Sequence, residues 1–130
     1  MKKIILIFYI TFFSYSTVSG QSYDAYTMQA MELYNAGKYK ESSKIWDKAF
    51  NIHKGFSTDY YNSACTNALA GNNVKAFEDL EKAIKSGWED IDWMKKDSDL
   101  ASLKESKEWV DFIKNIPELE QVYIGSLKIN

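Results

Sequence analysis

The 130-residue sequence contains no arginine, and all 16 of its basic side chains are lysines. Arginine is the residue best suited to hold phosphate or carboxylate groups in a two-point fork. The chain also carries a formal net charge of −2. Nucleic acids and anionic membrane surfaces are therefore poor candidate partners, because both attract proteins through basic side chains.

Cysteine and histidine occur once each, as Cys65 and His53. A lone cysteine cannot form an internal disulfide. Cys65 lies in a predicted helix without a nearby histidine or cationic cluster to stabilise a thiolate, so we interpret it as a buried or groove-facing side chain. His53 lies at the end of a predicted helix, where a favourable interaction with the helix C-terminus accounts for it without any reaction. The sequence therefore predicts no enzyme activity, no metal and no cofactor.

Two short stretches resemble ligand sites but lack the required spacing. Gly37-Lys38 has neither the preceding glycine nor the following Ser or Thr of a phosphate-binding loop, so a chain turn is predicted. The acidic stretch 89–99 would need a glycine at the sixth position of a calcium loop, but counting from Asp90 places Lys95 there. We expect its acids to cap helices instead.

Long apolar runs are also scarce, and the one from Ile4 to Phe13 follows Lys2 and Lys3 and precedes a small, polar stretch. This order is typical of a secretory signal peptide, with cleavage predicted after Gly20. A retained membrane anchor is the alternative, although the apolar run is short for a span. Cleavage would leave residues 21–130, with 14 lysines against 18 acids and a net charge of −4. We expect an exported protein, periplasmic or secreted, without a membrane span, and its lysine- and asparagine-rich composition fits an AT-rich bacterial genome.

The remaining chain repeats itself at an offset of 34 residues. Identical residues coincide at six positions: Tyr26 and Tyr60, Ala30 and Ala64, Ala36 and Ala70, Gly37 and Gly71, Lys48 and Lys82, and Ala49 and Ala83. Apolar residues recur at steps of three and four on either side of each glycine, which predicts a helix, a glycine turn and a second helix in each copy. Gly71 is expected to end its helix with a positive φ.

This unit resembles the tetratricopeptide repeat (TPR), a helix-turn-helix motif of 34 residues. In the first copy the matching residues are Tyr26, Ala30, Leu33, Gly37, Tyr39, Trp46 and Ala49, and in the second they are Tyr60, Ala64, Gly71, Ala76, Leu80 and Ala83. Asn67 and Asn73 depart from the pattern where Leu33 and Tyr39 stand, and Ser42 replaces an alanine. The resemblance implies an all-α fold, a right-handed α-solenoid of helix pairs with a degenerate C-terminal helical cap.

The resemblance also sets the expected organisation of the domain at 21–130. The repeats would cover about 23–56 and 57–90, a cap would cover 91–116, and a tail would cover 117–130. Amphipathic patterning predicts three short cap helices at about 89–95, 98–104 and 107–115, which would cover the open end of the second repeat. Pro117, the single proline, is expected to begin a further helix.

In a solenoid of this type the first helices of successive pairs line a concave groove. The register then predicts a partner-binding surface formed by Thr27, Met31, Tyr34, Tyr61, Cys65 and Leu69. Tyrosine and methionine suit contact with a peptide. We expect a non-catalytic module that binds a protein or peptide. Two alternatives remain open: the cap or tail fills the groove, or the chain is a structural element that associates with further copies of itself.

Overall fold

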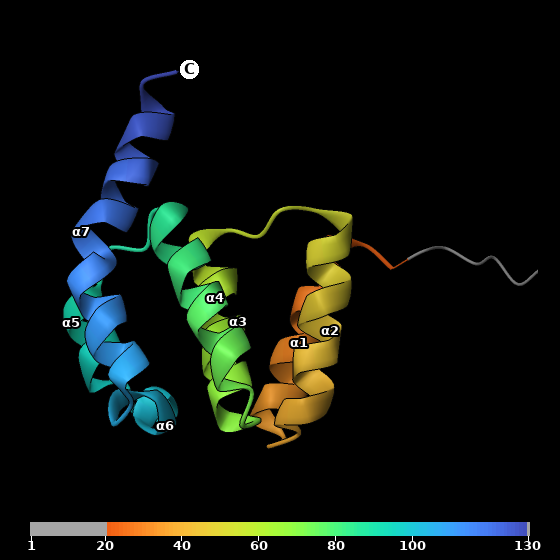
Figure 1. The fold of residues 1–130 in the computed structure, drawn as a ribbon. Helices are drawn as coiled ribbons and strands as arrows, with labels where there is room; N and C mark the ends of the chain where they lie inside the picture. The colour runs from red at the N-terminus through yellow and green to blue at the C-terminus, as the bar shows by residue number, and fades with distance from the viewer. Residues whose placement is uncertain (1–20, 130) are drawn as a thin grey trace, which may run out of the picture.

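The computed structural model describes residues 21–129, which form seven α-helices and one 3₁₀ turn. The order is α1 (Tyr23–Asn35), α2 (Tyr39–Ile52), α3 (Ser57–Leu69), α4 (Asn73–Lys85), α5 (Ile91–Lys96), the 3₁₀ turn η1 (Ser98–Leu100), α6 (Ala101–Lys104) and α7 (Lys107–Leu127). The hairpin α1–α2, the hairpin α3–α4 and the segment α5–α7 follow one another in space in chain order (Figure 1). The predicted all-α class is confirmed. The predicted signal peptide lies outside the described residues.

Glycine ends the first helix of each hairpin, as predicted. Gly37 has φ 71° and Gly71 has φ 82°. The N–H of Lys38 donates to the carbonyl of Leu33 at 2.9 Å, and that of Asn72 donates to the carbonyl of Asn67 at 2.8 Å. Each of these bonds joins an N–H to the carbonyl five residues earlier, as in a Schellman motif. The motif satisfies carbonyls that are left without partners at the helix end. Gly37-Lys38 is therefore a helix-ending turn.

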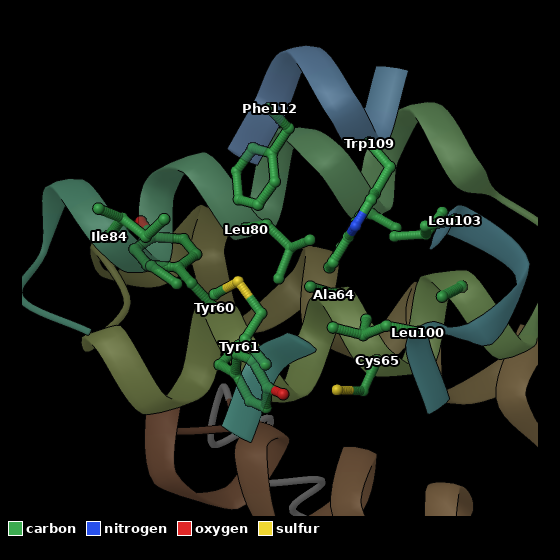
Figure 2. Packing of buried hydrophobic residues seen from close by; sticks show 14 of the residues in the cluster. Tyr60, Tyr61, Ala64, Cys65, Leu80, Ile84, Leu100, Leu103, Trp109 and Phe112 are labelled. Atoms are coloured by element: carbon green, nitrogen blue, oxygen red, sulfur yellow. The ribbon is translucent and has the colours of Figure 1, made fainter. Parts of the chain in front are cut away.

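Within each hairpin, the repeat places small residues on both helices. Ala30, Ala49, Ala64 and Ala83 are all fully buried, consistent with closely approaching helices. The core runs from α3 through α4 and η1 to α7. Figure 2 shows Leu80 of α4 near the middle of this cluster, with Phe112 and Trp109 reaching it from α7.

Two acids of the stretch 89–99, Asp90 and Asp97, cap helices, as expected. An Asp90 carboxylate oxygen accepts the N–H of Trp93 at 2.9 Å at the start of α5. An Asp97 carboxylate oxygen accepts the N–H of Asp99 at 3.0 Å at the start of η1. These bonds satisfy backbone donors that a helix start leaves without partners.

The prediction of a new helix at Pro117 is wrong, because α7 continues through it to Leu127. An interior proline removes one helical hydrogen bond and costs about 3 kcal/mol. Ile116 and Leu119, on either side of it, are 5% and 3% exposed. Burying two such side chains is worth roughly 3 to 6 kcal/mol, which offsets the proline. Residues 117–127 therefore extend the last helix of the expected cap rather than forming a separate tail.

Within residues 21–129, no helix has both the length and the apolar character needed to cross a membrane.

Candidate functional site

A cleft of about 390 Å³ lies where the first helices of the two hairpins meet the α5–η1 segment. Its lining residues are Met31, Tyr34, Tyr61, Asn62, Cys65, Trp93, Asp97, Ser98 and Asp99. Four of the six predicted site residues are thus brought together: Met31 and Tyr34 from α1, and Tyr61 and Cys65 from α3. The spacings of three and four residues place each pair on one face of its helix.

Two tyrosine hydroxyls hold the α5–η1 segment against the hairpins. The Tyr61 hydroxyl donates to a carboxylate oxygen of Asp97 at 2.7 Å. The Tyr34 hydroxyl donates to a carboxylate oxygen of Asp99. The predicted groove is therefore partly filled by the cap, and the cleft is the space left open beside the Asp97–Asp99 turn.

Tyr61 is held by contacts of both its ring and its hydroxyl. It stacks on Trp88 with ring centroids 3.9 Å apart and an interplanar angle of 2°. Its hydroxyl lies near the thiol of Cys65 on the same side of α3 (Figure 2). Both side chains are 4% exposed. They form the buried floor of the cleft, whereas Trp93, which is 54% exposed, stands at its edge.

Burial, and after it the neighbouring acids, keep these hydroxyl and thiol groups protonated. Burial raises the pKa of the Tyr61 and Tyr34 hydroxyls well above its ordinary value, and the hydrogen bonds to Asp97 and Asp99 raise it further. Burial also raises the pKa of the Cys65 thiol, as does the charge of Asp97. At neutral pH Cys65 is therefore a weak donor to Asp97, at 3.7 Å, and is poorly suited to nucleophilic attack.

The cleft is lined by two carboxylates and no lysine. The Lys104 amino group donates to the main-chain carbonyl of Asp97 at 2.6 Å rather than to its carboxylate. Ligand atoms of Cys65, Asp97 and Asp99 lie within 4.8 Å of one another. A hard cation such as calcium takes six to eight oxygen ligands, so this set offers only part of one coordination shell.

Thr27 and Leu69 do not line the cleft. The Thr27 hydroxyl donates to the main-chain carbonyl of Asp24 at 3.0 Å, within α1. Conversely, three residues that line the cleft were not predicted as site residues: Trp93, Asp97 and Asp99. From the sequence, they were assigned to the cap. Their approach to α1 and α3 depends on tertiary packing, and no repeat register indicates it.

Comparison with known proteins gives a distant relative. No family model matches the chain, and no solved structure matches it. A curated chloroplast protein from Arabidopsis thaliana is 27% identical over 105 residues. The match covers 78% of this chain and 30% of that protein, so the chain is similar to less than a third of its length.

Proposed function

We propose that this chain is an exported, non-catalytic binding module of tetratricopeptide type. In this proposal the two helix pairs and the cap form a short right-handed α-solenoid, and the cleft holds a peptide segment of a partner protein. Support for the repeat comes from the 34-residue register and from the equivalent turns at Gly37 and Gly71.

One observation carries the binding role. Met31 and Tyr34 come from one hairpin and Tyr61 and Cys65 from the other, yet all four line one cleft with the exposed Trp93. Ligand sites are typically concave, and a small number of placed polar groups fix the orientation of what they bind. The Asp97 and Asp99 carboxylates supply those polar groups.

The lining also indicates the chemistry of the peptide. The cleft lining contains two carboxylates and no lysine, so it favours binding of a positively charged group. Aromatic faces also attract a cation within about 6 Å of the ring. We therefore expect the bound segment to insert a lysine or arginine side chain, with apolar residues on either side of it against Met31 and Trp93.

The test is selection of binders from a library of random peptides on the purified protein. Enriched sequences should carry a basic residue flanked by apolar ones. For the best binder, the double variant Met31→Ala, Trp93→Ala should weaken binding by about tenfold or more, because it removes two contact side chains. Isothermal titration calorimetry measures the change.

The chain offers a matched control in Met28→Ala. Met28 is on α1 like Met31, is 66% exposed and does not line the cleft. Its variant should bind as the unmodified protein does. The proposed binding site is refuted if no peptide is enriched, or if Met28→Ala weakens binding as much as the double variant Met31→Ala, Trp93→Ala does.

A further inference from the structure

A second, larger groove lies between α4 and α7 and shares no residue with the cleft. Its volume is about 650 Å³. The lining residues are Val74, Phe77, Glu81, Glu108, Asp111, Phe112, Lys114 and Asn115. Positions 74, 77 and 81 of α4 follow helical spacing, as do positions 108, 111, 112 and 115 of α7. Each helix therefore contributes one continuous face to the groove.

The floor of the groove is apolar and partly open to solvent. Phe77 and Phe112 lie with their ring centroids 6.0 Å apart, across the contact between the two helices. Phe112 belongs to the core and is 6% exposed, whereas Val74, at the start of α4, is 76% exposed. An apolar side chain from outside could extend the core by covering Val74 and Phe77.

The rim is acidic on both sides of this floor. Glu81 stands on α4, and Glu108 and Asp111 stand on α7, against the single Lys114. Glu81 pairs with Lys85 at 3.3 Å. Among the described residues no ion pair engages Glu108 or Asp111. The start of a helix favours such acids, which accounts for Glu108. The pairing with Lys85 four residues further on accounts for Glu81, whereas neither explanation applies to Asp111.

We propose that the α4–α7 groove binds a basic amphipathic helix of a partner protein. An apolar strip with acids on both edges complements a helix whose apolar face is flanked by lysines or arginines, which is the helix-in-groove mode of recognition. A second copy of this chain is a poorer occupant, because residues 21–130 carry a net charge of −4 and would repel an acidic groove.

The experiment measures fluorescence anisotropy of a labelled synthetic helix of roughly 18 residues, about five turns, with leucines on one face and lysines on the other. The double variant Glu108→Lys, Asp111→Lys should weaken its binding to the full protein by about tenfold or more, because both edge charges reverse. Raising the salt from about 50 to about 300 mM should weaken binding to the unmodified protein as well. A companion peptide with glutamates in place of lysines should not bind.

The matched control is Glu105→Lys, Glu118→Lys, which changes the net charge equally at exposed positions outside the groove. It should retain binding, and so should the cleft variant Met31→Ala, Trp93→Ala. Circular dichroism establishes that each variant is folded. The proposal is overturned if the control loses as much affinity as the groove variant, if only the cleft variant loses it, or if no binding occurs. Sedimentation of the protein alone tests whether the groove binds a second copy. If the protein forms a dimer that the groove variant abolishes, the groove is an interface between copies and the proposal is overturned.

Discussion

The two hairpins share one sequence pattern but differ in how deeply they are buried. In α3, eight residues are buried, whereas in the equivalent helix α1 only Ala30 is. The difference comes from position, because α3–α4 lies between the first hairpin and α5–α7, while α1–α2 has a neighbour on one side (Figure 1). The second hairpin must therefore bury two faces, although it shares its sequence pattern with a hairpin that buries only one.

The second hairpin meets this demand with polar residues where the first has apolar ones. Asn67 stands at the position of Leu33, and Asp79 at that of Ile45. The Asn67 amide donates to the Asp79 carboxylate at 3.0 Å, and the Ser63 hydroxyl donates to it at 2.7 Å. The Ser43 hydroxyl of α2 donates to the Asn67 side-chain carbonyl at 2.6 Å. The departures from the repeat thus form one buried network that joins the two hairpins.

Restoring the repeat residue at Asn67 should break this network with the largest effect. In Asn67→Leu, the Ser43 hydroxyl and the Asp79 carboxylate each lose a partner in the interior. We expect the free energy of unfolding to fall by about 2 to 3 kcal/mol, because each buried polar group left unsatisfied costs about 1 to 3 kcal/mol. Urea denaturation followed by circular dichroism measures it.

The double variant Asn67→Leu, Asp79→Ile is the control, since it gives the second hairpin the residues of the first. It should recover part of the loss, because replacing both partners with apolar groups removes the unsatisfied charge. Burial raises the pKa of Asp79 above its ordinary value of 3.8. The folded state therefore favours the protonated acid, and this contribution to stability decreases as the pH rises from about 3.8 through the raised pKa. The double variant should lack that pH dependence, and strictly additive losses would contradict the network.

The sequence predicts what is local. The glycine turns depend on residues within one helix end, and the positive φ at Gly37 and Gly71 follows from the repeat alone. The caps at Asp90 and Asp97 are local in the same sense. These turns and caps could therefore be placed with little knowledge of their neighbours.

The features that depend on contacts between residues far apart in the sequence were missed. The helix passes through Pro117 because Ile116 and Leu119 are buried, and that burial is invisible before α7 is placed. The cleft is similar: Met31 and Tyr61 follow from the repeat register, whereas Asp97 reaches Tyr61 only through the path of the cap. A third turn, at Gly87, was also missed because the 34-residue offset does not produce it.

Gly87 adds a third case to the two repeat turns, because all three glycines have positive φ but only Gly87 has a crowded neighbourhood. An added Cβ at Gly37 or Gly71 would meet nothing within 4 Å, whereas at Gly87, with φ 99°, it would meet the ring of Tyr123 at 2.7 Å. Gly37→Ala and Gly71→Ala should each cost about 1 to 2 kcal/mol from backbone strain alone. Gly87→Ala should cost more than either in thermal melts, because Tyr123 must also move.

Gly125 is the matched control for these variants. It lies inside α7 without a positive φ, and an added Cβ there has open space. Gly125→Ala should therefore stabilise the protein by up to about 1 kcal/mol, since alanine favours a helix interior. Equal losses at Gly71 and Gly87 would contradict the role given to Tyr123.

The smallest expected effect comes from a solvent-exposed link between the hairpins. Asp47 of α2 forms an ion pair with Lys75 of α4, and Asp47 lies one helical turn from Ser43. The two side chains are 50% and 31% exposed, so solvent screens the attraction. A double-mutant cycle of Asp47→Asn and Lys75→Gln should give a coupling of less than about 1 kcal/mol that shrinks as salt is added. A salt-independent coupling as large as the loss in Asn67→Leu would contradict the view that burial, rather than the number of links, decides how firmly the first hairpin is held to the second.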